Sequence, residues 1–170
     1  MSHLDTIKSL AKNIRIDILE MTSNANSGHP GGSLSATDIV AVLYGSILNY
    51  DSSNPKWESR DRFILSKAHA CPVLYAALAE TGYFDKSELM TFRKLNSRLQ
   101  GHAHIKTPGV EMSGGSLGQG LSFGVGVSLA AKVDQKNYRT FVLLGDGELN
   151  EGQVWEAIMS ANKYKLDNLV

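Results

Sequence analysis

The most informative segment of this chain is Tyr138-Arg-Thr-Phe-Val-Leu-Leu-Gly-Asp-Gly147. Its apolar run, Phe141-Val-Leu-Leu144, is not interrupted by polar residues and stops at Gly145. Strands of parallel sheets are buried on both faces and therefore carry such continuous apolar runs. We predict a central, buried parallel strand over residues 138–144, followed by a tight turn.

The flanking sequence alternates between helix and strand patterns. Small and large residues alternate over 121–133, which indicates a tightly packed helix, and residues 151–165 are typical of another. A short apolar run predicts a strand at 63–65, and a further strand begins at 169–170. Strand, helix and strand in this order favour an α/β fold. We expect one domain over residues 1–170, with three layers and a mainly parallel sheet covered by helices.

The N-terminal part contains further helical patterns. Apolar residues recur every three or four positions over 7–21, as in an amphipathic helix with one buried face. The run 24–33 is rich in glycine and contains a proline, so it should interrupt any helix. Ser35 or Thr37 would then cap the next helix, and Ser87 should cap a short helix farther along the chain.

Composition excludes several classes of protein. The 170 residues include 17 basic and 17 acidic side chains, so no global field attracts nucleic acid or an anionic membrane. No stretch approaches the ~18–20 apolar residues of a membrane span, and the N-terminus lacks the apolar core of a signal peptide. The single cysteine, Cys71, cannot form an internal disulfide, which fits a reducing compartment. We therefore expect a cytoplasmic protein.

The turn Gly145-Asp146-Gly147 follows the predicted buried strand. Ligands of open α/β sheets bind at the carboxyl ends of strands, where glycines let a phosphate approach the backbone. A carboxylate there can hold a hard cation such as Mg²⁺. These residues suit a diphosphate bridged by a divalent metal, although an ordinary Asp-Gly turn remains an alternative. The dinucleotide motif Gly-x-Gly-x-x-Gly is not formed, because Phe123 and Asn150 occupy its last position.

Three histidines lie in separate segments bordered by glycine or at the start of a predicted helix. His29 lies in Ser-Gly-His-Pro-Gly-Gly, His69 begins a helix over 69–78 that is expected to end near Gly82, and His102 follows Gly101. Imidazole gains or loses a proton near neutral pH, so these side chains are candidates for a shared catalytic site.

These segments, in this order, resemble the transketolase family. The resemblance rests on motifs that cover the chain from residue ~5 to 170, namely Ser27-Gly-His-Pro-Gly-Gly32, Arg60-Asp-Arg-Phe63, Leu65-Ser-Lys-Ala-His-Ala70, Gly101-His102, Gly114-Gly-Ser-Leu-Gly-Gln-Gly120 and Gly145-Asp-Gly-Glu-Leu-Asn-Glu-Gly152. Gly-Asp-Gly is shared by many thiamine-diphosphate enzymes, whereas the histidine segments point more narrowly to transketolase. The resemblance implies the diphosphate-binding domain of the thiamine-diphosphate-binding fold.

The resemblance also implies roles for individual residues. Asp146 would bind Mg²⁺ or Ca²⁺, and His29, His69 and His102 would be catalytic. Residues implied to bind thiamine diphosphate are His69, Gly115, Leu117, Gly145, Gly147 and Glu151, while Glu151 and Glu156 match acidic residues near the family's subunit interface. The family transfers a two-carbon ketol unit between sugar phosphates, and the cofactor's thiazolium ring delocalises the resulting carbanion.

Other features of the resemblance concern partners. Lys67-Ala68, Ser116 and His104 depart from many full-length members and resemble split transketolases. No segment resembles the pyrimidine-binding domain, so we expect a C-terminal partner chain that carries it, and a homo-oligomer, most simply a dimer.

The domain is expected to be incomplete at its C-terminal end. Family members place a further metal ligand, an asparagine, beyond the next strand; Asn168 is expected to lie far from the metal. A non-catalytic, self-associating module remains an alternative. So does another thiamine-diphosphate reaction, such as that of deoxyxylulose-phosphate synthase or of a 2-oxoacid dehydrogenase component.

Overall fold

The computed structural model describes residues 2–170 and contains five α-helices and two strands within that range. The strands are β1 (Arg62–Leu65) and β2 (Thr140–Leu143), and the helices are α1 (His3–Ala25), α2 (Pro30–Val42), α3 (Cys71–Glu80), α4 (Gln119–Val133) and α5 (Gly152–Lys163). Shorter helical turns are a π-helical turn at Leu43–Ile47 and 3₁₀ turns at Ala68–Ala70, Lys86–Thr91 and Gly147–Asn150.

The sheet is parallel throughout, and β2 is its middle element. β1 and β2 pair with Phe63 opposite Phe141. On the other side of β2, Leu169 forms a parallel bridge to Thr140, and the amide of Val170 donates to the Thr140 carbonyl oxygen at 2.9 Å. The predicted strands at 138–144 and 63–65 are therefore confirmed in part as β2 and β1, although Val142 and Leu143 are only partly buried, and residues 169–170 form an isolated bridge instead of a strand.

Asp61 links the beginnings of both strands by hydrogen bonds. This carboxylate is buried and accepts hydrogen bonds from the backbone amide of Arg139 at 2.7 Å and from its guanidinium at 2.7 Å. It also accepts one from the amide of Asn49 at 3.0 Å. The contacts hold β1 and β2 in register at their amino ends. The loops that follow both strands therefore lie side by side at the same edge of the sheet.

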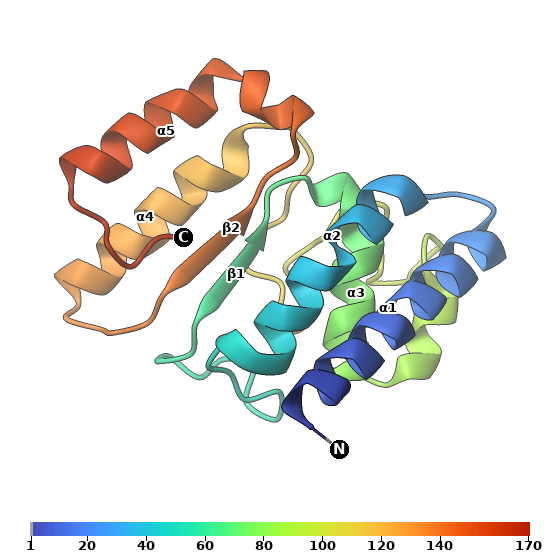
Figure 1. Ribbon diagram of the computed structural model, residues 1–170. Coiled ribbons are helices and arrows are strands. Elements are labelled where there is room, and N and C mark those ends of the chain that lie inside the picture. Colours follow the sequence, from blue (N-terminus) through green and yellow to red (C-terminus); the bar gives the residue numbers. More distant parts are fainter. Residues whose placement is uncertain (1) are drawn as a thin grey trace.

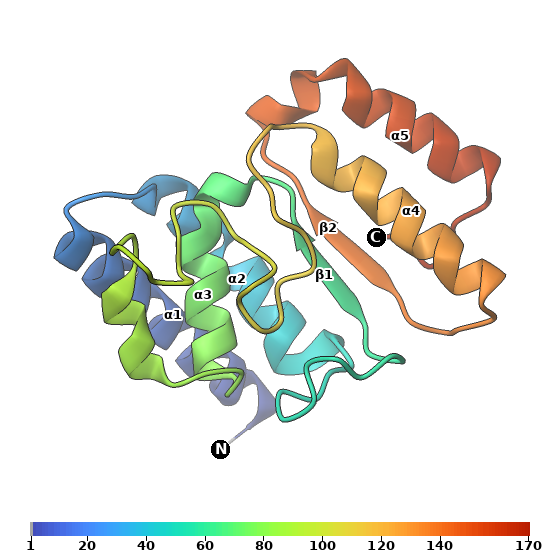
Figure 2. The same ribbon diagram turned by 180° about the vertical axis from the view of Figure 1, so that it is seen from behind.

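Helices cover the sheet on both faces, which gives the predicted three layers. Helices α1, α2 and α3 lie on one side of β1 and β2, and α4 and α5 lie on the other (Figure 1). The view from behind shows the same arrangement, with the loop that precedes α4 passing beside α3 (Figure 2). None of the helices formed by residues 2–170 is both long and apolar enough to cross a membrane.

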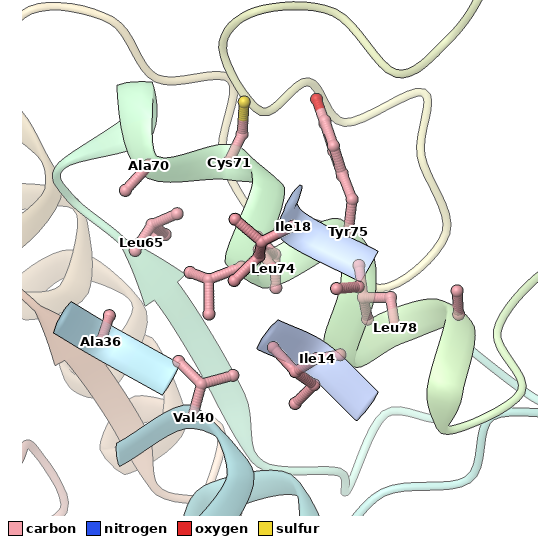
Figure 3. Packing of buried hydrophobic residues seen from close by; sticks show 14 of the residues in the cluster. Ile14, Ile18, Ala36, Val40, Leu65, Ala70, Cys71, Leu74, Tyr75 and Leu78 are labelled. Carbon is pink, nitrogen blue, oxygen red and sulfur yellow. The ribbon is translucent and has the colours of Figure 1, made fainter. Parts of the chain in front are cut away.

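The main core lies between the sheet and the helices α1, α2 and α3. Figure 3 shows Ile14 and Ile18 of α1 beside Leu74 and Leu78 of α3, and all four side chains are buried. Every residue from position 71 to 79 is buried, so α3 is apolar on all sides and fills the middle of this half. Burial also raises the pKa of the Cys71 thiol to about 12, which makes it an unreactive part of the core.

Glycines allow α4 to approach the sheet closely, as its small residues predicted. A Cβ atom on Gly124 would lie 2.5 Å from Cγ2 of Val142, and one on Gly120 would lie 2.4 Å from Oγ of Ser66. Gly126 faces open space, with no atom within 4 Å of such a Cβ. The close contacts of α4 at Gly120 and Gly124 are therefore made with residues of this same chain.

Two expected helix starts were wrong. Helix α2 begins at Pro30, because proline suits the first position of a helix, and the interruption is limited to residues 26–29. Ser35 and Thr37 lie inside α2 and donate to the carbonyl oxygens of Gly32 and Ser33. Farther along, Asp85 caps the 3₁₀ turn instead of Ser87, accepting a hydrogen bond from the Ser87 amide at 2.7 Å.

Candidate functional site

A pocket of about 290 Å³ lies at the carboxyl ends of β1 and β2. Its lining comes from four separate segments of the chain: Gly32, Ser35, Lys67, His69, Leu117, Gly145, Asp146, Gly147 and Glu148. Three larger hollows, of about 610, 410 and 320 Å³, are lined by surface residues away from these strand ends. The smaller pocket is the candidate site, because it gathers the residues that sequence motifs singled out.

His69 lies at the centre of this convergence. Strand β1 ends at Leu65, and the 3₁₀ turn that follows holds His69 partly buried in the pocket wall. Its pKa is lowered by burial and, to a smaller extent, by the positive charges that His29, Lys67 and His102 can carry. A lowered pKa keeps this imidazole neutral near pH 7, with one ring nitrogen free to accept a proton.

His29 adjoins His69 directly. The two rings meet edge to face, with centroids 5.2 Å apart. His29 occupies the cap position before α2, where its side chain makes no capping hydrogen bond and remains exposed. Ser33 fixes this arrangement, since its hydroxyl donates to the carbonyl oxygens of His29 at 2.9 Å and Ala70 at 3.3 Å.

The loop that carries His102 is attached beside the same turn. The Tyr75 hydroxyl donates to the His102 carbonyl oxygen at 3.2 Å, and the Gly114 amide donates to that of Ala103 at 3.2 Å. A Cβ on Gly114 would lie 2.6 Å from Cβ of Ala68, so only glycine permits this approach. The fold thus brings the three predicted histidine segments together, but of the three side chains only His69 lines the pocket, and His29 and His102 are exposed beside it.

His104 has a different position. Its Nδ1 accepts a hydrogen bond from the amide of Lys106 at 3.0 Å, which stabilises the turn after it. The residue does not line the pocket.

Asp146 and Lys67 supply opposite charges to the pocket. Asp146 is exposed at the start of the 3₁₀ turn, next to Gly147. The Lys67 ammonium donates to the Gly32 carbonyl oxygen at 2.9 Å, and its pKa is lowered by burial, which the charges of Asp146 and Glu148 partly offset.

Two carboxylates line the pocket, and of these only Asp146 is exposed to a metal ion. Within residues 2–170, no group of three or more His, Cys, Asp or Glu side chains is arranged to hold a metal. Asn168 is turned toward the body of α4, where its amide nitrogen donates to the Ser128 carbonyl oxygen at 3.0 Å. It therefore lies away from Asp146, as predicted.

The glycine-rich segment before α4 forms the opposite rim. Leu117 lines the pocket, and Gly115 is exposed with open space where a Cβ would project. Gly118 has φ +82° and directs the chain into α4. Glu151 does not line the pocket but lies behind this rim, because a Cβ on Gly118 would be 3.1 Å from Cβ of Glu151. Glu156 is exposed on α5.

Glu148 is a residue that sequence reasoning missed. Its side chain is buried, and it accepts hydrogen bonds from the Ser66 hydroxyl, from the Gly118 amide at 2.8 Å and from the Gly145 amide at 2.9 Å. The amide of Gly145 is consequently directed inward, so that amide is not offered to a ligand. The available sequence signal was a carboxylate directly after Gly-Asp-Gly, between the strand end and the next helix.

Comparison with known proteins decides the family. Residues 6–170 match the family model described as "Transketolase, thiamine diphosphate binding domain". The chain belongs to the transketolase family. It corresponds to the N-terminal, thiamine-diphosphate-binding section of transketolases. This domain match, together with the parallel sheet, confirms the predicted α/β fold class.

Similar transketolases are both full-length and split. The chain is 46% identical to transketolase of Homo sapiens over 98% of its own length and 27% of that protein. It is 41% identical to one subunit of the apulose-4-phosphate transketolase of Phocaeicola vulgatus, over 98% of its own length and 59% of that protein. The chain thus spans about a quarter of the full-length relatives and less than two thirds of the split one.

Solved transketolase structures share the fold. Transketolase from Campylobacter jejuni superposes with a TM-score of 0.92 at 39% identity, covering 97% of this chain and 28% of that one. A transketolase from Pichia stipitis in complex with sedoheptulose-7-phosphate gives a TM-score of 0.92 at 35% identity, covering 99% of this chain and 26% of that one.

Proposed function

We propose that this chain is the cofactor-binding component of a cytoplasmic transketolase, which moves a two-carbon ketol unit from a ketose phosphate to an aldose phosphate. The observation that carries the proposal is the convergence of His69, Asp146 and Leu117 in one pocket, with His29 against His69. The transketolase relatives support the reaction, and a Pichia stipitis transketolase in complex with a sugar phosphate supports the substrate class.

The pocket's residues fit thiamine diphosphate and a divalent cation. Gly115 and Gly147 leave open space where side chains would project, so a ligand can approach the backbone. Asp146 offers the oxygen that Mg²⁺ or Ca²⁺ prefers. The Lys67 ammonium, in the same lining, provides positive charge for a diphosphate. Leu117 supplies an apolar contact for a heterocyclic ring.

The bound cofactor supplies an electron sink for the carbon–carbon cleavage. The chain's own groups move protons and hold the sugar. His69, with its lowered pKa, can take a proton at its free ring nitrogen from a sugar hydroxyl and later return it. His29, edge to face with it, and the exposed His102 can donate hydrogen bonds to other hydroxyls and retain the sugar near His69.

A second chain is part of the proposal. The split relative from Phocaeicola vulgatus and the share of the full-length relatives that is covered support a partner that carries the pyrimidine-binding domain. Self-association is supported by apolar side chains that α5 leaves exposed, since Trp155 and Met159 are 57% and 66% accessible. Glu151 and Glu156 border that same face.

Calorimetry with thiamine diphosphate and Mg²⁺ tests the proposal. For the 170-residue chain alone, we expect binding weaker than micromolar, because Asp146 is its one candidate carboxylate ligand. A partner chain should tighten binding and give ketol transfer between sugar phosphates, and light scattering should show a homo-oligomer. A monomer that binds no cofactor even with its partner would refute the function, and self-association alone would support the non-catalytic alternative.

A further inference from the structure

The buried carboxylate of Glu148 joins three segments that are separate in sequence. Oε1 accepts from the Ser66 hydroxyl, which follows β1, and from the Gly118 amide, which precedes α4. Oε2 accepts from the Gly145 amide, which follows β2. Only 1% of the Glu148 surface is exposed. Each segment also contributes a neighbouring residue to the pocket, namely Lys67, Leu117 and Asp146.

An ionised carboxylate suits this position better than any other side chain. All three neighbours are donors, and a carboxylate offers two oxygens that only accept. A glutamine amide has one oxygen and a donor nitrogen, so at least one N–H or O–H would face another donor. Hydrogen bonds to a charged acceptor in a buried place are stronger than neutral ones, and unpaired donors there are costly.

The surroundings keep these donors in place. Gly118 needs its positive φ of 82° to turn its amide toward Glu148 while leading the chain into α4. Gly120 lacks the Cβ that would collide with Ser66 at 2.4 Å, which leaves room for the Ser66 hydroxyl to reach the carboxylate. The arrangement therefore depends on the end of β1 and on the start of α4.

We infer that Glu148 is a positioning residue: it holds the turn at 145–147 against the rim at 117–118, so that Asp146 and Gly147 face the diphosphate end of the cofactor. This role rests on the proposed function. Both oxygens of Glu148 accept hydrogen bonds from protein donors, so they act on these segments instead of binding the ligand. Its loss should therefore weaken cofactor binding while leaving the chemistry of His69 intact once the cofactor is bound.

Amide NMR tests the geometry without any cofactor. In Glu148→Gln, the amide resonances of Gly118 and Gly145 should shift, and the amides of residues 146 and 147 should exchange faster with solvent. Two controls separate this from the general effect of replacing a carboxylate by an amide. Asp17→Asn changes another buried carboxylate, in the outer helical layer, and Glu20→Gln changes an exposed one. Unmoved Gly118 and Gly145 resonances in Glu148→Gln would overturn the inference.

Cofactor titration of the protein with its partner tests the consequence. Glu148→Gln should raise the Kd of thiamine diphosphate about tenfold or more, with kcat at saturating cofactor close to that of the unchanged protein; Glu148→Asp should recover part of the affinity. Unchanged Kd despite shifted glycine resonances would overturn the positioning role. If Glu148→Gln does not fold, Ser66→Ala should still move the Gly118 resonance and raise the Kd of thiamine diphosphate severalfold. The absence of both effects in Ser66→Ala would refute the inference. An unchanged protein that binds no cofactor would refute the proposed function instead, and the NMR result would then decide the geometry alone.

Discussion

The rings of His29 and His69 meet edge to face, with centroids 5.2 Å apart and an angle of 71° between their planes. They come from segments on two different helices, and no sequence pattern fixed their distance. A positive charge on His29 would disfavour protonation of His69.

Replacing His29 should therefore change the acid–base behaviour of His69. Burial lowers the pKa of His69 below its ordinary value of about 6.5, and the charge of His29 lowers it further. His29→Gln should move that pKa upward, so the acid limb of the activity profile should move to higher pH. NMR titration of the His69 ring measures the shift directly. His104→Gln is the control, because the His104 ring is bonded to the Lys106 amide of its own turn, and an unshifted His69 in His29→Gln would contradict the coupling.

Asp146 should be needed for metal-dependent cofactor binding. Asp146→Asn should weaken binding of thiamine diphosphate with Mg²⁺ by at least about tenfold, since loss of even an outer-shell partner has effects of that size. Calorimetry at fixed Mg²⁺ measures the change. Asp134→Asn, an exposed residue at the end of α4, should bind normally. Equal affinities for both variants would exclude Asp146 as a ligand.

His102 should affect turnover more than cofactor affinity. Its exposed side chain adjoins the His69 turn, where a sugar would lie, and a sugar that is held in the wrong place costs about 100-fold in rate. Steady-state assays of His102→Ala with its partner chain should show this loss in kcat with a nearly unchanged Kd for thiamine diphosphate. The matched variant His104→Ala should retain its turnover. Normal kcat in both would remove His102 from the reaction.

Two glycines of α4 should respond in opposite ways to alanine. Gly124→Ala places a Cβ 2.5 Å from Val142 and should destabilise the protein by about 1–3 kcal/mol, the usual effect of overpacking. Gly126→Ala meets open space and should be neutral or stabilising by up to about 1 kcal/mol, because alanine favours helices. Urea unfolding of both variants checks the difference, and equal stabilities would mean that α4 does not approach β2 so closely.

Asp17 should make stability depend on pH. Its burial raises its pKa to about 6 from 3.8, against the opposing effect of Lys86, while the charge of Glu80 adds to the rise. The contribution of the raised pKa of Asp17 to the free energy of unfolding is complete below pH 3.8. It is lost as the pH rises through about 6, because the buried carboxyl then ionises. Asp17→Asn should therefore gain stability relative to the unchanged protein between pH 4 and 7, by at most about 3 kcal/mol.

Unfolding at several pH values measures this gain. Lys86 is half exposed, so solvent screening should keep the gain in stability below about 3 kcal/mol. Asp38→Asn, which breaks an exposed ion pair with Arg15, should show little dependence on pH over the same range. A parallel response of the two variants would contradict the effect of burial.

Elements with a strong local pattern were predictable. The run Phe141–Leu144 predicted the central strand because strands covered by helices on both faces need no alternation, and the glycines at 145 and 147 marked the strand end where the pocket lies. The start of α2 was not predictable from its glycines, because Pro30 suits the first position of a helix and the two glycines follow it within that helix. Glu148 was missed since two of its partners, Ser66 and Gly118, are 82 and 30 residues away in sequence.

The hydrogen bonds of Asp61 at the strand beginnings have a kinetic consequence. They join Asp61 to Arg139 across 78 residues, so β1 and β2 can align only after a long loop has closed. Closing such a loop costs entropy before any pairing stabilises it, and folding slows as contacts become less local. Helices α1, α2 and α3 meet through nearer contacts and can condense first. During synthesis, the histidines at 29, 69 and 102 thus lie on a helical layer without a pocket until residues 138–150 complete the sheet beside them.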